Sequence, residues 1–443
     1  MKLVEHHLIR KTDPRYAAID QAAFAAKNLY NQALYQIRQS FIHEGKYLPY
    51  AEIFHRLKHH EAYRGLPAKV SNSILIQLHK NWVAFFKELD AYRADPSKFL
   101  GRPRIPGYKD KEKGRSILIY DKQALGKRAF KKTSKLIPSG LPIKIETKLA
   151  WEQIDQVRIV LRGSCYMIEV IYTIKEQQAA VDPHLIAALD LGVEHLAALT
   201  SNKPGFAPRL VNGRPLKDFN HYYNQQRARH QQRLARQHHT TSHQLDRITA
   251  KRTRRINHYL HTASRRIIDL LVLEGIGTLV IGLNRLWKQE VNLGRRNNQG
   301  FVQIPHSRFI DMLTYKAHLV GIRVIVREES YTSQASFLDR DEIPTYDPVR
   351  TEKLIFSGTR EHRGLYRAKD GRRIQADIHG SYNILRKEFP NAFSDSQTGS
   401  GQEIGAQQLR LAAWVANVGR IPVPPCQSEA VCKGLRSYFE PSV

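Results

Sequence analysis

Carboxylates stand at the ends of apolar runs in a chain that is otherwise strongly basic. Asp190 follows one such run, and the pair Glu328 and Glu329 follows another. Asp377 begins the last predicted helix. Because hard cations prefer oxygen ligands, three converging carboxylates could hold two Mg²⁺ or Mn²⁺ ions, and two ions about 4 Å apart promote hydrolysis of a phosphodiester. These residues therefore predict a two-metal nuclease site.

Each acid also has an ordinary structural interpretation. Asp190 could close a turn before Gly192, and Asp377 could cap its own helix. Glu328 and Glu329 could be solvated ends of a strand. The joint placement of the acids favours a single metal site over three separate roles. Since successive strand residues face opposite sides, only one of the two glutamates is expected to enter the site, and the sequence leaves open which one.

Alternating strands and helices must position these acids. Apolar runs predict strands and helices in turn, which is typical of an α/β domain. The predicted strands are 185–189, 196–199, 278–283 and 322–326, and the predicted helices are 305–320 and 377–389. A polar loop is predicted at 287–300, and residues 336–370 are polar and predicted to be irregular. The Ser-, Gly- and Pro-rich end of the chain predicts a mobile tail with one helix near 409–418.

The N-terminal half predicts a helical bundle and a small β structure. A strand is expected over residues 1–9, and apolar stripes predict amphipathic helices over 19–41 and 74–89. Short alternating runs then predict strands of a small barrel or sandwich. These runs are 117–120, 143–145, 157–161 and 166–172.

The composition is that of a folded protein with a polyanionic partner. The chain has 443 residues, of which 42% are hydrophobic and 25% charged, so two or three domains are expected. Against 41 Asp and Glu there are 70 Lys and Arg, a net charge of +29 that nucleic acid would complement. No apolar run approaches the roughly 20 residues of a membrane span, and a cytosolic protein is expected. The three cysteines are too few for a disulfide framework or a four-Cys zinc site.

The ordered set of motifs resembles the TnpB family, the transposon-encoded RNA-guided nucleases related to type V CRISPR effectors. The motifs are Gly-Arg-Pro-Arg-Ile-Pro-Gly-Tyr-Lys at 101–109, Ala-Leu-Asp-Leu-Gly at 188–192, Tyr-Thr-Ser-Gln at 331–334 and Ala-Asp-Ile-His-Gly-Ser-Tyr-Asn-Ile-Leu at 376–385. The resemblance covers about residues 1–393. Each motif alone is weak evidence, but the ordered set is specific.

The resemblance implies a multidomain α+β protein. Its domains would be a wedge-like β-barrel (1–12 and 96–180), a helical recognition bundle (13–95), an RNase H-like RuvC α/β nuclease domain (181–335 and 371–393), an insertion (336–370) and a tail (394–443). The implied partners are a guide RNA derived from the transposon end and a double-stranded DNA target. Asp190 and Asp377 fall on the first and third catalytic positions of the family.

The chain departs from the family in two places. Family members usually carry a glutamate where this chain has Gly282. Because neighbouring strands lie about 4.8 Å apart, Glu328 or Glu329 on the next strand could supply the missing ligand. The second departure concerns zinc. Many relatives carry a zinc ribbon between the second and third motifs, where this chain has residues 336–370. That stretch has no Cys and only one His, His362, so we expect no zinc with tetrahedral Cys ligation.

Two basic regions are predicted to bind nucleic acid. Residues 203–266 contain 15 Lys or Arg but only two acids, which predicts long basic helices along a duplex, although a solvated helix is the simpler alternative. The second region is a stiff Pro/Gly segment, for which a plain linker is the alternative interpretation. The candidate contacts are Lys251, Arg252, Arg254 and Arg255 in the first region and Arg102, Arg104, Tyr108 and Lys109 in the second. Tyr331, Thr332, Ser333 and Asn383 are predicted to support the acidic site, with Asn383 near the metal or the scissile phosphate.

These observations predict an RNA-guided DNA endonuclease of a mobile element. An inactive RNA-guided DNA-binding repressor is the first alternative, supported by Gly282. A DNA transposase is the second, because carboxylate–metal sites also serve strand transfer. The sequence leaves open the guide RNA, the target-adjacent motif, the cut pattern, the oligomeric state and the role of the tail.

Overall fold

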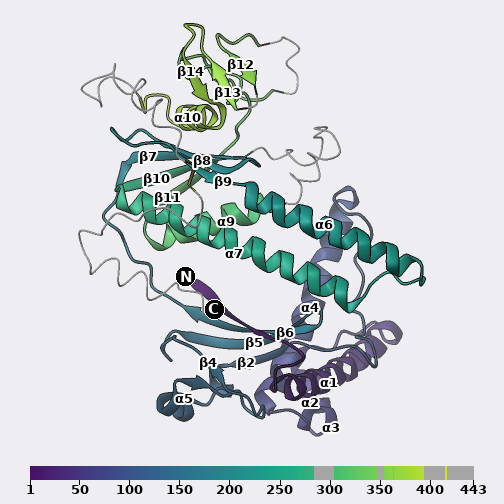
Figure 1. Ribbon diagram of the computed structural model, residues 1–443. Helices are drawn as coiled ribbons and strands as arrows, with labels where there is room; N and C mark the ends of the chain where they lie inside the picture. The colour runs from purple at the N-terminus through teal and green to yellow at the C-terminus, as the bar shows by residue number, and fades with distance from the viewer. Residues whose placement is uncertain (284–303, 348–353, 363, 394–414, 417–443) are drawn as a thin grey trace. The chain divides into compact units, whose positions relative to one another are not determined.

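Contacts between residues divide the chain into two units. The computed structural model describes residues 1–283, 304–347, 354–362, 364–393 and 415–416 (Figure 1). Unit 1 comprises residues 1–175 and 241–247, and unit 2 comprises 176–240 and 248–443. No helix in these described ranges is both long and apolar enough to cross a membrane. The predicted loop at 287–300 lies outside the described residues.

Unit 1 contains the predicted helical bundle. Its helices are α1 (Tyr16–His43), α2 (Tyr50–Leu57), α3 (Glu61–Arg64) and α4 (Ala68–Ala94), followed by the 3₁₀ turn η1 (Pro96–Lys98). The stripe predicted on α1 is confirmed, because Ile19, Ala26, Leu29 and Ala33 recur at helical spacing and are fully buried. The core of the bundle is apolar and aromatic, and Trp82 of α4 lies at its centre with no exposed surface.

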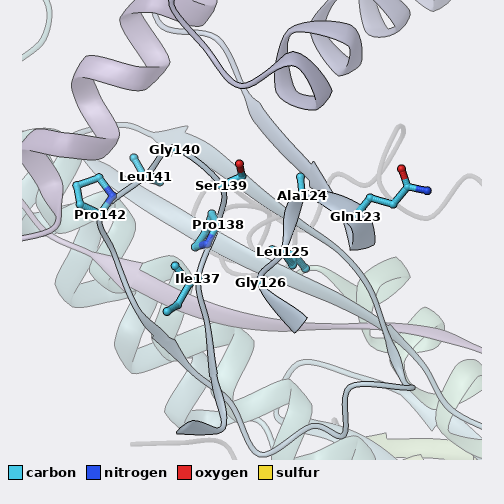
Figure 2. A pocket seen from close by; sticks show the side chains of 10 residues that line it. All are labelled: Gln123, Ala124, Leu125, Gly126, Ile137, Pro138, Ser139, Gly140, Leu141 and Pro142. Atoms are coloured by element: carbon cyan, nitrogen blue, oxygen red, sulfur yellow. The ribbon is translucent and has the colours of Figure 1, made fainter. Parts of the chain in front are cut away.

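Unit 1 also holds a four-stranded antiparallel sheet in the order β1-β6-β5-β2. Its strands are β1 (Lys2–Ile9), β2 (Leu118–Asp121), β5 (Ile154–Arg162) and β6 (Cys165–Thr173), and the connection from β2 to β5 carries η2 (Lys122–Ala124), α5 (Lys127–Thr133), β3 (Lys135–Leu136) and β4 (Ile145–Glu146). A hollow in this connection is lined by residues 123–126 and 137–142 (Figure 2). None of the predicted acids lines it.

Unit 2 is built on a six-stranded sheet in the order β11-β10-β7-β8-β9-β15. The strands are β7 (Asp182–Leu191), β8 (His195–Ser201), β9 (Arg209–Asn212), β10 (Ile276–Gly282), β11 (Arg323–Arg327) and β15 (Val415–Ala416). Strand β10 is parallel to β7 and β11, whereas β8 is antiparallel to β7 and β9. Strand β15 lies where the sequence predicted a helix, so that prediction is wrong at residues 415–416. The rest of the tail lies outside the described residues.

Helices cover both faces of this sheet (Figure 1). The helices are α6 (Arg214–Ala235), α7 (His243–Leu273), α9 (His306–Leu319) and α10 (Ala376–Glu388). Alternate residues of β7 separate the faces: Leu189 packs with α7 and α9, and Ala188 packs with α10. The same alternation places Asp190 on the face covered by α10.

The insertion is more regular than the sequence predicted. It contributes β12 (Thr359–His362) and β13 (Leu365–Arg367), which form an antiparallel sheet with β14 (Arg373–Gln375). The short polar strands carry almost no apolar alternation, which is why they escaped detection. Tyr366 anchors this sheet, because its ring stacks on His379 of α10 at a centroid distance of 3.9 Å and its hydroxyl donates to the Gln334 carbonyl at 2.7 Å.

A buried lysine joins α9 to α7. Lys316 is 4% exposed, and its Nζ donates to the His261 carbonyl at 2.7 Å and to Ser264 Oγ at 2.8 Å. Burial, helped by the charge of Arg265, lowers the pKa of Lys316 from 10.5 to about 7. Since the unfolded chain still protonates this group near 10.5, the folded state loses stability as the pH falls from about 10 to about 7 and loses no more below that.

Lys316→Met is therefore expected to stabilise the protein at pH 8. The pKa difference corresponds to about 3 kcal/mol at that pH, and the two lost hydrogen bonds offset about 1 kcal/mol of it. The melting temperature of the variant should exceed that of the wild type by several degrees at pH 8, and the gap should shrink by pH 10. Equal melting curves at pH 8 would contradict the prediction.

Candidate active site

The predicted acids converge on the face of the unit 2 sheet that α10 covers. Asp190 stands near the end of β7, and Asp377 lies in the first turn of α10. A Cβ atom added to Gly380 would lie 2.7 Å from Asp190 Oδ2, so the Asp190 carboxylate rests directly against α10. Gly380 allows the helix to approach the strand this closely.

Electrostatics link three of the acids. Burial is the largest cause that raises the pKa of Asp190 well above its ordinary range, and the negative charges of Glu329 and Asp377 raise it further. Arg360 of β12 acts in the opposite direction. The acids predicted from three separate motifs therefore belong to one cluster.

Asp377 is held in its ionised form. His195 Nδ1 lies 2.7 Å from Asp377 Oδ2, and Gln375 Nε2 donates to the same oxygen at 3.2 Å. Burial acts to raise the pKa of Asp377, but the hydrogen bonds from His195 and Gln375 outweigh it and lower the pKa below its ordinary value. His195 was not predicted from the sequence. The tight turn from β7 to β8, which returns His195 to the end of the strand that carries Asp190, was the signal that could have revealed it.

Glu329 occupies the space that Gly282 leaves open. A Cβ atom on Gly282 would lie 2.5 Å from Glu329 Oε2. That oxygen is buried and has no hydrogen-bond partner among the described residues. Burial, followed by the charge of Glu328, raises the pKa of Glu329 to about 7. Glu329 therefore faces the cluster with an unsatisfied carboxylate.

Glu328 is paired with groups other than the acids. Its carboxylate accepts from Lys387 Nζ at 2.9 Å and from the Ser330 backbone N–H at 2.6 Å. Burial acts to raise the pKa of Glu328, but these hydrogen bonds outweigh it and lower the pKa. The alternation of side chains predicted that only one glutamate would enter the site; in the structure Glu329 lies beside Gly282 and Glu328 is paired with Lys387.

A divalent cation fits the chemistry of this cluster. A positive ion would relieve both the repulsion that raises the pKa of Asp190 and the missing partner of Glu329 Oε2. Across the described ranges, however, no group of three His, Cys, Asp or Glu residues lies close enough to hold a metal ion. The carboxylates would have to draw together around an ion to bind it.

The loop after Glu329 is fixed by hydrogen bonds. Thr332 Oγ1 donates to the Glu329 carbonyl at 2.8 Å. The amide of Asn383, which is fully buried, donates to the carbonyls of Thr332 and Ala335 at 2.9 and 2.6 Å. The Asn383 amide thus holds the backbone of this loop, and its approach to a metal or phosphate stays a prediction.

Other predicted supporting residues shape the same loop. Tyr331 adopts a left-handed backbone conformation with φ of 64°, which turns the chain directly after the two glutamates. Ser333 is exposed and makes no contact that places it in the cluster. Arg360, whose positive charge acts on both Asp190 and Asp377, was not predicted, because nothing in the polar insertion distinguishes it from its basic neighbours.

The predicted basic segment of unit 1 is anchored on α1. Asn31 pairs with both backbone groups of Lys109 at 2.9 Å. Lys109 is half-buried over the Tyr30 ring, and burial lowers its pKa. Arg102 and Arg104 are exposed, and Tyr108 is 47% exposed. The segment therefore presents two arginines and one aromatic ring to solvent, and Lys109 contributes mainly to packing.

The basic residues of α7 divide into two pairs. Arg252 Nε donates to Asn220 at 2.7 Å, and its guanidinium lies over the Tyr223 ring. Arg255 lies over the Phe219 ring of α6. Lys251 and Arg254 are exposed and make no ion pair among those recorded for the described residues. The first pair joins α7 to α6, which Figure 1 shows side by side, and the second pair faces solvent.

Two parts of the chain match models of known protein families. Residues 169–287 match the model of a family described as a probable transposase, OrfB_IS605. Residues 306–384 match the Cas12f1-like TNB domain. These two matches confirm the resemblance to the TnpB family that the motifs predicted. No curated protein matches it in sequence.

Solved structures of similar proteins share low sequence identity with this chain. A Cas12f1–sgRNA–target DNA complex is 14% identical, with 83% of this chain and 81% of that chain covered and a TM-score of 0.48. The mini-RNA-guided endonuclease CRISPR-Cas_phi3 is 10% identical, with coverage of 87% and 92% and a TM-score of 0.39. Alicyclobacillus acidoterrestris C2c1 in complex with single-guide RNA is 10% identical, with 85% of this chain and 67% of that chain covered and a TM-score of 0.34.

Proposed function

We propose that this protein is an RNA-guided DNA endonuclease with a RuvC-like active site formed by Asp190, Glu329 and Asp377. The observation that carries the proposal is the convergence of these three carboxylates on one face of the unit 2 sheet. In a chain of net charge +29, such a cluster has no structural advantage, because basic side chains are available to neutralise isolated acids. The sheet of β7 to β11 would be the RNase H-like nuclease domain, and the β1-β6-β5-β2 sheet would belong to the wedge.

The side chains would divide the work of hydrolysis. Asp190, Glu329 and Asp377 would hold two Mg²⁺ or Mn²⁺ ions, and bound ions of this kind activate water and stabilise a leaving oxygen. His195 and Gln375 orient Asp377. Arg360, which is exposed and whose charge acts on Asp190, would attract the target phosphate.

The proposed partners are a guide RNA and a double-stranded DNA target. Base pairing would supply the sequence specificity, while the exposed basic residues hold the backbones. The guide-loaded protein, mixed with matched duplex DNA and Mg²⁺, is expected to release cut products. Asp190→Ala should bind the same duplex without cutting it. Tight binding without cutting by the wild type would instead indicate the repressor, and joined DNA ends would indicate a transposase.

The repressor remains the second candidate because of two observations. Gly282 stands where the family carries its glutamate, and the acids are not gathered to ligand distances. Under this alternative the protein would bind its guide RNA and its target DNA but would not hydrolyse the DNA.

The two pairs of basic residues on α7 lead to a prediction about salt dependence. Each lost phosphate contact lowers the slope of log binding constant against log salt by about 1. The double variant Lys251→Gln/Arg254→Gln should therefore lower the slope by about 2. Arg252→Gln is the matched control, because its side chain is engaged by Asn220 and Tyr223, and it should lower the melting temperature while leaving the slope in place. A full slope in the double variant would exclude these two residues as phosphate contacts.

A further inference from the structure

The backbone around Glu329 is held from both sides. On the preceding side, the Glu328 carboxylate accepts from the Ser330 N–H at 2.6 Å. On the following side, Thr332 closes a turn onto the Glu329 carbonyl at 2.8 Å. The peptide that carries the proposed ligand is therefore more constrained than an ordinary strand end.

One side chain connects these constraints. Lys387 Nζ donates to Glu328 Oε2 at 2.9 Å and to the Ser330 carbonyl at 2.8 Å. Its side chain is only 2% exposed, whereas that of Glu328 is 37% exposed. Lys387 lies near the end of α10, the helix whose first turn carries Asp377. The same rigid helix thus holds one proposed ligand and grips the residues on both sides of another.

We infer that Lys387 is a positioning residue that makes Glu329 the ligand contributed by this strand. By engaging Glu328 and Ser330 together, it fixes the Glu328 carboxylate away from the cluster. Held between these two anchored residues, Glu329 extends its Oε2 into the space over Gly282. This inference rests on the proposed function, and it assigns to Lys387 no contact with the metal or the substrate.

A purely structural role for Lys387 makes a different prediction. If the lysine only satisfied its own burial, its loss would lower the melting temperature and leave the metal affinity of the folded protein unchanged. If it positions Glu329, its loss should weaken metal binding, because removal of a group that orients a ligand typically costs about 10- to 100-fold in affinity.

The test measures Mn²⁺ binding by electron paramagnetic resonance on the guide-loaded protein, together with melting temperature and cleavage. Lys387→Met should raise the Mn²⁺ dissociation constant at least about tenfold. Lys316→Met is the matched control, since it also removes a buried lysine from unit 2, and it should leave the Mn²⁺ affinity at the wild-type value. Glu328→Gln/Lys387→Met removes both partners without leaving an unpaired charge, so it keeps the test informative if the single variant fails to fold.

The cycle of Glu328→Gln, Lys387→Met and their combination identifies the route of the effect. If Lys387 acts through Glu328, the double variant should bind Mn²⁺ no more weakly than Lys387→Met alone. Wild-type Mn²⁺ affinity in every folded Lys387 variant, or additive losses in the double variant, would overturn the inference. Failure of the wild type to bind Mn²⁺ and to cut would be a failure of the proposed function, and the wild-type sample alone reveals it.

Discussion

Replacing Glu329 by glutamine is expected to lower the cleavage rate of the guide-loaded protein about 1,000-fold. Loss of a carboxylate ligand removes several kcal/mol of the charge stabilisation that a metal site provides, and about 4 kcal/mol corresponds to three powers of ten in rate. Glutamine keeps the volume of the side chain, so the buried contact with Gly282 is preserved. Guide RNA and target binding should therefore remain at wild-type levels.

The neighbouring residue supplies the control. Glu328→Gln loses only the contacts with Lys387 and Ser330, so it should retain far more activity than Glu329→Gln. Single-turnover cleavage with saturating Mg²⁺, together with a binding assay on uncut DNA, separates chemistry from association. The assignment would be refuted by equal activity in the Glu329→Gln protein and the wild type.

Gly282→Glu is expected to abolish cleavage, although it restores the residue that relatives usually carry. A Cβ atom at this position would lie 2.5 Å from both Glu329 Oε2 and Ile384 Cδ1. The new side chain would therefore displace the existing ligand, add a like charge and overpack the site by about 1–3 kcal/mol. We expect at least about a 100-fold loss of rate, which corresponds to some 2.7 kcal/mol.

The compensating change should recover activity. In Gly282→Glu/Glu329→Gly, the carboxylate comes from β10 and no longer meets the Glu329 side chain, while the close contact with Ile384 remains. Cleavage should therefore rise at least about tenfold above the Gly282→Glu variant. The repressor alternative predicts the reverse pattern. If the natural site were inactive for want of a glutamate, Gly282→Glu alone would create cleavage that the wild type lacks.

Strong periodicity made most of the fold predictable from the sequence. The helices α1 and α4 carry long apolar stripes, and β7, β10 and β11 contain apolar runs, so their existence and type followed from the sequence pattern alone. Strand β9 was missed because its four residues stand at the start of the basic stretch. The sheet of the insertion was missed because packing of Tyr366 on His379, and not an apolar alternation, stabilises it.

The site was predictable as a set of acids but not as a geometry. Asp190 and the two glutamates could be predicted because each follows an apolar run, and the ends of neighbouring strands lie at one edge of a sheet. The choice between Glu328 and Glu329 depends on Lys387, which lies 59 positions from Glu328 in the sequence. No motif or periodicity marks Lys387 as part of the site. Contacts between distant segments of this kind are set by tertiary packing, which a single sequence does not display.

The way the insertion is attached has a practical consequence for studying metal dependence. Its sheet is fastened to α10 by the stacked rings of Tyr366 and His379, and to the loop after β11 by the Tyr366 hydroxyl, which donates to the Gln334 carbonyl. A chelator touches neither contact. Exhaustive dialysis against EDTA should thus strip divalent ions while leaving this part of the protein folded. Mg²⁺, Mn²⁺ or any other cation could then be added back singly. The cation that cleavage requires would thus be measured without interference from refolding.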